Sequence, residues 1–108
     1  MNKILMTAAM LEKCGYKNVV VCVEDLLKTR RELYLDLKSN MNLILTQKIL
    51  NLGEARFSFF EHKNDYDLHN LVGINCDAAI IEGNPSKDFT DILCLGLRIG
   101  DNPIRVYI

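Results

Sequence analysis

The sequence lacks any long apolar run and any strong excess of one charge sign. Its 108 residues include 13 Lys and Arg against 14 Asp and Glu, for a formal net charge of −1. The apolar runs are only a few residues long, far short of the roughly 20 residues that a membrane-spanning helix needs. Without a basic excess, the chain has no general attraction to nucleic acid or to an anionic membrane. We therefore predict a single cytoplasmic domain over residues 1–108 that does not bind membranes.

Paired cysteine motifs are also missing. The four cysteines, Cys14, Cys22, Cys76 and Cys94, form no C-x-x-C pair, which excludes a zinc knuckle and a thioredoxin-type redox motif. Three of them, Cys22, Cys76 and Cys94, lie in apolar stretches. We expect buried free thiols in a reducing cytoplasm.

Helical and extended segments alternate along the chain. With 49% apolar and 25% charged residues, the composition is that of an ordinary globule. Strands separated by helices predict an α/β fold, a three-layer sandwich with a mostly parallel sheet of about four strands flanked by helices. The expected elements are helix 3–14, strand 18–23, a helix after Glu24-Asp25, a helix from Met41 to Leu52 capped by Gly53, strand 56–62, a polar loop over 63–70, strand 77–81, a helix from Pro85 and strand 104–108.

The stretch from Leu71 to Gly83 resembles part of a P-loop ATPase core of the RecA-like kind. In phage terminase large subunits and some helicases, an "L-x-G" loop leads into an "h-D-h-h-h-D-E" strand. Here Leu71-Val72-Gly73 is similar to that loop and Asp77–Glu82 is similar to that strand. Upstream, helix 3–14 and strand 19–23 resemble the helix and strand that follow a Walker A loop. The resemblance covers most of the chain and implies a phage-encoded protein.

The phosphate-binding loop of that family is absent, because no G-x-x-x-x-G-K-[ST] occurs anywhere in the sequence. The resemblance places the magnesium-binding acid at Glu82 and the water-activating acid at Gly83, which cannot act as a base. It therefore implies a degenerate core, lacking the Walker A loop, that does not hydrolyse ATP.

Acids follow the predicted strands, and the carboxyl ends of parallel strands meet at one edge of a sheet. Glu24, Asp25 and Glu82 are candidate ligands for Mg²⁺ or Mn²⁺, which prefer carboxylate oxygens. Under the same hypothesis Glu61, Lys63 and Glu82 are the catalytic residues, and Glu61-His62-Lys63 has the E-x-K spacing of restriction-type nucleases. The competing interpretation is structural: these acids cap helices and solvate strand ends.

Two further segments are candidates for binding. The polar loop 63–70 is the expected place of ligand contact, since binding residues favour loops on rigid scaffolds. Strand 104–108 is short, apolar and nearly uncharged. At a sheet edge such a strand would pair with another chain, which predicts a protein partner or a homodimer.

The sequence thus supports three functions. The first is a non-catalytic binding or regulatory module that acts through protein–protein contacts and uses no cofactor. The alternative is a nuclease or phosphodiesterase that depends on Mg²⁺ or Mn²⁺, and only this alternative makes nucleic acid the partner. The third is nucleotide binding without hydrolysis.

Overall fold

The computed structural model describes residues 2–37, 48–97 and 102–108. Its strands form one sheet in the order β2-β3-β1-β4-β5, in which β2 alone runs antiparallel to its neighbour. The strands are β1 (Asn18–Val23), β2 (Ile49–Leu52), β3 (Ala55–Glu61), β4 (Ala78–Ile81) and β5 (Ile104–Tyr107).

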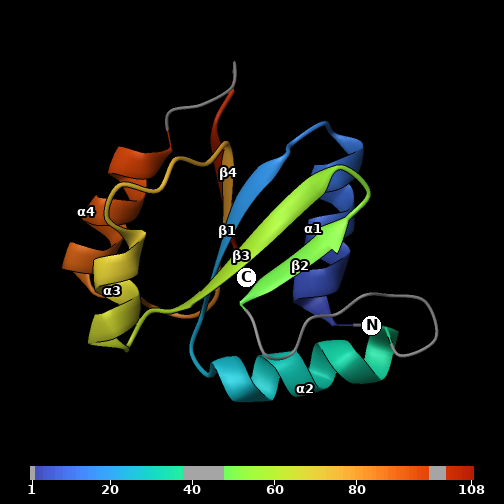
Figure 1. Cartoon of the computed structure of the whole chain (residues 1–108), viewed down its shortest axis with the longest axis horizontal. Helices are drawn as coiled ribbons and strands as arrows, with labels where there is room; N and C mark the ends of the chain where they lie inside the picture. Colours follow the sequence, from blue (N-terminus) through green and yellow to red (C-terminus); the bar gives the residue numbers. More distant parts are fainter. Residues whose placement is uncertain (1, 38–47, 98–101) are drawn as a thin grey trace.

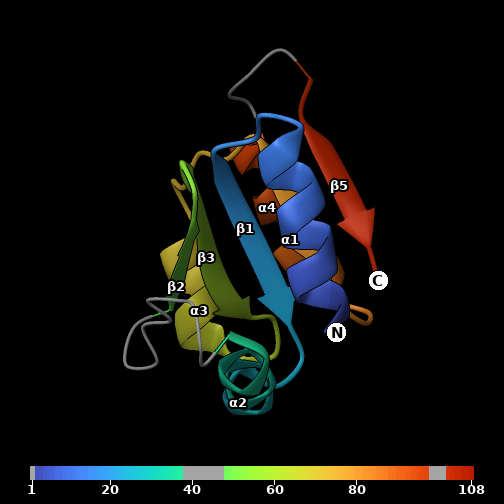
Figure 2. The same cartoon turned by 90° about the vertical axis from the view of Figure 1, so that its right-hand side faces the viewer.

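Helices cover both faces of this sheet. On one face lies α1 (Lys3–Lys13), and on the other lie α3 (Asp65–Leu71) and α4 (Lys87–Gly96) (Figures 1 and 2). The remaining helix, α2 (Leu26–Leu37), runs across the end of the sheet at which β1 finishes. The predicted α/β sandwich with a mostly parallel sheet is therefore confirmed, with five strands instead of about four.

The β-branched run in β1 follows from its central place. Alternate residues of a strand point to opposite faces, so Val19, Val21 and Val23 pack in the core beneath α1. On the other face Val20 and Cys22 pack in the core beneath α3 and α4. Both rows are fully buried, as expected of a parallel strand covered on each side.

The helix starts are set by short polar side chains. The Asn2 side chain accepts hydrogen bonds from the main-chain N–H groups of Ile4 and Leu5 at 2.8 and 3.2 Å. Ser86 accepts from Phe89 N at 3.2 Å and so begins α4. These bonds satisfy donors that have no partner inside a helix.

The predicted helix from Met41 to Leu52 is wrong at its end. Residues 49–52 form strand β2, Leu50 is buried, and Gly53 lies in the turn of the β2–β3 hairpin with a φ of 56°. The apolar spacing of a short segment fits a helix and a strand alike, and pairing with β3 decides between them. The first part of that predicted helix lies outside the described residues.

The predicted loop over 63–70 is also wrong, because residues 65–71 form α3. The Asn64 side chain caps this helix by accepting from Tyr66 N and Asp67 N. Asn followed by acids in the first turn is a helix-start signal, so the sequence did carry the information.

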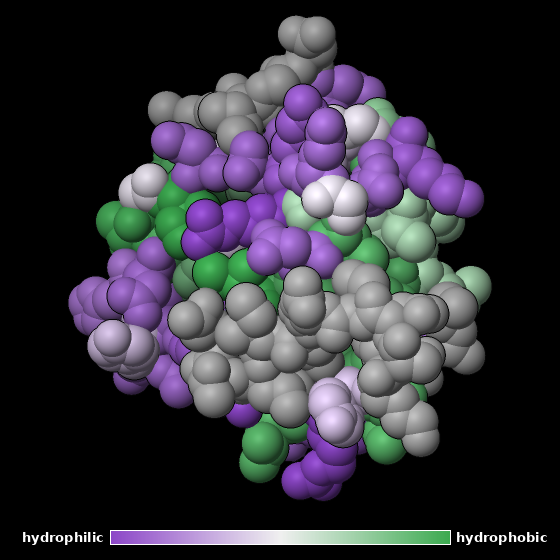
Figure 3. Space-filling view, turned by 45° about the vertical axis from the view of Figure 1, so that its right-hand side comes forward, coloured by the Kyte–Doolittle hydropathy of each residue, from purple (hydrophilic) through white to green (hydrophobic). Residues whose placement is uncertain are grey.

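In the face of the molecule shown in Figure 3, hydrophilic side chains outside the grey region are mixed with small apolar groups. No helix in the described part of the chain is long and apolar enough to cross a membrane.

Candidate functional site

The strands that precede the predicted acids end at one edge of the sheet. Strands β1, β3 and β4 are parallel neighbours and end side by side; we call this place the carboxyl edge. The chain order reverses here, with β3 on one side of β1 and β4 on the other. The crevice beyond such a reversal is the usual ligand position in open α/β sheets. At this position α2 lies beneath the strand ends (Figures 1 and 2).

The carboxylates at this edge hold the main chain that enters α2. Glu82 Oε1 accepts a hydrogen bond from Glu24 N at 3.0 Å, and Glu61 Oε2 accepts one from Leu26 N at 2.9 Å. Asp25 Oδ1 accepts from Lys28 N at 3.1 Å, within the first turn of the helix. A carboxylate that accepts such bonds satisfies helix-start donors, and this use matches the structural interpretation of the acids.

Glu24 lies against Gly83, the position to which the family resemblance assigns the water-activating acid. Gly83 has a φ of 72°, and a Cβ built there would overlap Glu24 Oε1. The Glu24 carboxylate therefore occupies the space that a side chain at position 83 would fill. Sequence reasoning found both residues and did not find that they meet.

A hollow at the carboxyl edge gathers some of the candidate residues and leaves others out. It is lined by Glu24, Asp25, Lys28, Thr29, Glu32 and Glu82. Glu61 faces the first residue of α2 instead, and Lys63 is exposed beyond β3. Among residues 2–37, 48–97 and 102–108, no group of three or more His, Cys, Asp or Glu side chains is placed to hold a metal ion.

His62 joins the end of β3 to the end of β4. The residue is 7% exposed, and its Nε2 lies 2.9 Å from the Glu82 carbonyl oxygen. Its ring packs edge-to-face on Phe89 of α4, with centroids 5.9 Å apart. This partly apolar, hydrogen-bonded setting makes His62 a structural link between the two strand ends.

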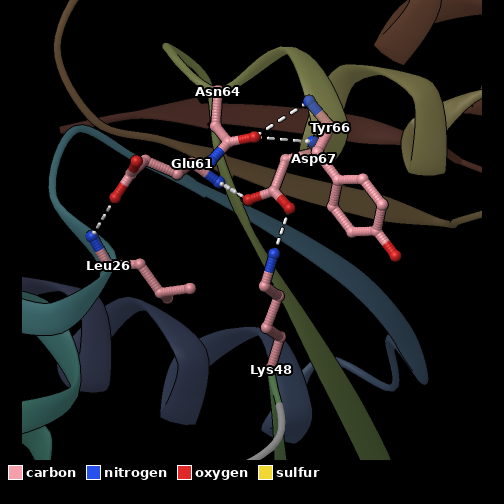
Figure 4. Close-up of polar contacts among 6 residues, drawn as sticks. All are labelled: Leu26, Lys48, Glu61, Asn64, Tyr66 and Asp67. Atoms are coloured by element: carbon pink, nitrogen blue, oxygen red, sulfur yellow. Dashed lines mark hydrogen bonds and ion pairs between the residues drawn. The ribbon is translucent and has the colours of Figure 1, made fainter.

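Asp67 lies in the segment predicted as a polar loop, and its structural role was not predicted from the sequence. It is 1% exposed, and its Oδ2 accepts from Glu61 N at 2.7 Å. Its Oδ1 forms an ion pair with Lys48, just before β2 (Figure 4). One buried carboxylate thus ties α3 to the end of β3 and to the start of β2, with the Asn64 cap beside it (Figure 4).

The last strand of the sheet presents a different kind of surface. β5 pairs with β4 on one side and has no strand on its other side in the described part of the chain; we call that side the β5 edge. Ile104 N and Ile108 N donate to Asp77 O and Ile81 O of the β4 side. Because direction alternates along a strand, the N–H and C=O groups of Arg105 and Tyr107 point outward.

The side chains of β5 alternate as well. Ile104, Val106 and Ile108 are partly buried against the core beneath α1, whereas Arg105 and Tyr107 are exposed on the opposite face. Ahead of the strand, the Tyr16 hydroxyl donates to Asn102 O at 2.8 Å, which fixes the start of β5 against the sheet. The predicted strand is confirmed, and the structure places it at an edge of the sheet.

Burial of the inner cysteines disfavours the thiolate, which is the nucleophilic form of the side chain. Burial, with the charge of nearby Cys76, raises the pKa of Cys22 far above its ordinary value. Burial, with the charge of Asp77, raises the pKa of Cys76 to about 11. The expected burial of Cys94 is wrong: it is exposed, and Arg105 Nη1 donates to its Sγ at 3.2 Å.

Comparison with known proteins identifies the fold. No protein-family model and no curated protein matches the sequence. Among solved structures, the large terminase from a thermophilic bacteriophage is similar, with a TM-score of 0.66 and 11% sequence identity. The match covers 94% of this chain and 28% of the terminase chain. This chain therefore has the fold of a part of that phage terminase.

Proposed function

We propose that this chain is a non-catalytic protein-binding module that acts through the β5 edge. The module is built on a degenerate RecA-like core without a phosphate-binding loop, and it is encoded by a phage. The observation that carries the proposal is the row of outward main-chain groups on Arg105 and Tyr107. Exposed strand edges of this kind bind an added strand through main-chain hydrogen bonds.

The use of the acids at the carboxyl edge supports the non-catalytic part of this proposal. Glu61, Glu82 and Asp25 each accept a hydrogen bond from the main chain around the start of α2. These bonds turn one oxygen of each carboxylate toward the main chain, and within the described residues no three His, Cys, Asp or Glu side chains are placed to hold a metal ion. The sequence also lacks the G-x-x-x-x-G-K-[ST] motif, which supplies the main-chain donors that hold nucleotide phosphates in this class.

The main-chain groups and side chains of the β5 edge indicate what kind of partner it would bind. It is an extended polypeptide segment whose own N–H and C=O groups pair with Arg105 and Tyr107. Its side chains meet Ile104 and Val106 on one face and the exposed Tyr107 ring on the other. A segment that alternates apolar and polar residues fits these two faces.

Photo-crosslinking in the cell of origin tests this use of the edge. Tyr107, which is 59% exposed, is replaced by p-benzoylphenylalanine; Tyr66 of α3, which is 71% exposed, is the matched control. We expect a defined crosslinked polypeptide from position 107 and none from position 66. Equal crosslinking at both positions, or none at 107, contradicts the proposal.

The second candidate function is a nuclease or phosphodiesterase dependent on Mg²⁺ or Mn²⁺. One observation favours it: Glu24, Asp25 and Glu82 line the same hollow. A thermal-melt titration with Mn²⁺ separates the two functions, because a bound ion raises the melting temperature by mass action. On the binding-module proposal, millimolar Mn²⁺ shifts neither the wild type nor Glu82→Ala. A shift in the wild type that Glu82→Ala removes establishes the metal site instead.

A further inference from the structure

We infer that the strand seated on the β5 edge is β5 of a second copy of this chain, paired antiparallel about a two-fold axis at Val106. This inference rests on the proposed function, because it requires the β5 edge to be a binding surface. It adds the identity of the partner and the register of the pairing.

The main chain limits the pairing to a short stretch. The outward positions of β5 are 103, 105 and 107, and the residue at 103 is proline, which has no N–H to donate. Only Arg105 and Tyr107 therefore offer both an outward donor and an outward acceptor in this strand. A partner strand that uses this edge fully must place two such residues opposite them.

A second β5 meets this requirement in one register. With Val106 opposite Val106 of the second copy, each Arg105 lies opposite a Tyr107, and both outward residues of both copies are used. This arrangement makes about four main-chain hydrogen bonds, as two hydrogen-bonded residue pairs of an antiparallel ladder do. Moving the two-fold axis to Arg105 shifts the register by two residues: one complete pair remains, and each Tyr107 lies opposite Pro103, which can accept a hydrogen bond and cannot donate one.

The side chains select the same register. Arg105 opposite Tyr107 sets a guanidinium beside an aromatic ring, a favourable cross-strand pair. Arg105 opposite Arg105 would place like charges together, which destabilises a sheet. On the α1 face, Val106 meets Val106, and Ile104 meets Ile108 of the second copy. These three side chains are only partly buried in one chain, and pairing covers them further.

The test combines sedimentation with amide exchange measured by NMR on the full chain at low and high concentration. We expect a monomer–dimer equilibrium in which the amides of Arg105 and Tyr107 become protected as concentration rises. The amide of Val106 points to β4 and should be protected at every concentration. Monomers at high concentration with fast-exchanging Arg105 and Tyr107 amides overturn the second copy as partner and leave the edge open for another polypeptide. Protection of both amides independent of concentration overturns the proposed function as well.

Two variants at one position isolate the main-chain donor. Tyr107→Pro removes the outward N–H without touching a bond to β4, while Tyr107→Thr removes the same ring and keeps the N–H. Each dimer of the proline variant loses two hydrogen bonds, so we expect its dissociation constant to rise about tenfold relative to Tyr107→Thr. Equal dissociation constants for the two variants overturn the inferred pairing. A melting curve of each variant confirms that the monomer folds.

Discussion

The carboxyl edge and the β5 edge are both rich in polar groups, and they differ in whether those groups have partners. At the carboxyl edge, the side chains of Glu61, Glu82 and Asp25 accept hydrogen bonds from nearby main chain. At the β5 edge, the outward main chain of Arg105 and Tyr107 meets no strand in the described part of the chain. Buried polar groups are costly without partners, and exposed ones bind water until a partner replaces it. From residue type alone, the acids would be the favoured binding site. Because the acids already accept hydrogen bonds and the outward main chain of β5 pairs with no strand in the described part of the chain, the β5 edge is the favoured site instead.

The largest expected effect comes from breaking the buried network at the carboxyl edge. Asp67→Ala leaves Glu61 N without an acceptor and Lys48 without its buried carboxylate, so we expect a loss of about 2 to 3 kcal/mol in the free energy of unfolding. Urea denaturation measures it. Asp65→Ala, an exposed acid in the same helical turn, is the control and should cost about 0.5 kcal/mol. Equal losses for both variants would mean that Asp67 does not hold the three elements together.

A smaller effect decides whether Glu82 is structural. Glu82→Ala removes the acceptor for Glu24 N and should cost about 1 kcal/mol. Glu82→Gln keeps an acceptor oxygen and should cost less than half of that. Thermal melts of the two variants check the order. An increase in stability on Glu82→Ala would contradict the structural role, since removing a functional residue commonly stabilises a protein.

Two glycine-to-alanine variants test the packing of Glu24 on Gly83. Gly83→Ala and Gly73→Ala both force a side chain into a positive φ, of 72° and 84°, at a cost of about 1 kcal/mol each. A Cβ at Gly73 meets nothing within 4 Å, whereas one at Gly83 meets the Glu24 carboxylate. Because the end of that exposed side chain can rotate away, we expect the two losses to agree within about 0.5 kcal/mol. A much larger loss at Gly83 would show that Glu24 is held in place, as a functional carboxylate would be.

The last prediction concerns a change in the free energy of unfolding that occurs only at alkaline pH. The native pKa of Cys76 is about 11, above the ordinary value of 9.0, so the folded chain holds its proton where the unfolded chain releases it. The stability that this contributes is complete below the unfolded pKa and is lost as pH rises toward 11. Urea unfolding at pH 7 and at alkaline pH should show the fall. The fall should be smaller in Cys76→Ala, and an equal fall in both would contradict the raised pKa.

Much of the fold could be predicted because its strongest signals are local. The β-branched run of β1 and the glycine that ends α1 identify those elements directly. β2 could not be predicted, because a strand of four residues carries too few positions to separate a period of 2 from one of 3.6. Its assignment depends on pairing with β3, which sequence spacing does not contain.

The gathering of some strand-end acids at one edge could be predicted from the sequence, whereas the positions of Glu61 and Lys63 outside the hollow could not. Parallel strands must end together, so Glu24, Asp25 and Glu82 were expected at one edge, and they line one hollow there. Which oxygens accept main-chain bonds depends on the path of the chain into α2, and α2 crosses the strand ends in a way that no local pattern specifies. The contact of Glu24 with Gly83 joins two loops that are far apart in the sequence.

Pro103 has a consequence for how far an assembly of this chain can grow. A long unbroken edge offers donors along its whole length and can add strand after strand, which is the route to fibres. Here the proline ends the row of donors, and an isologous pair uses both copies of β5 and leaves none for a third chain. The outer strands of such a pair are both β2, an antiparallel edge of different sequence. The inferred β5 pairing is therefore closed at two chains, and further growth would need a different contact, such as one through β2.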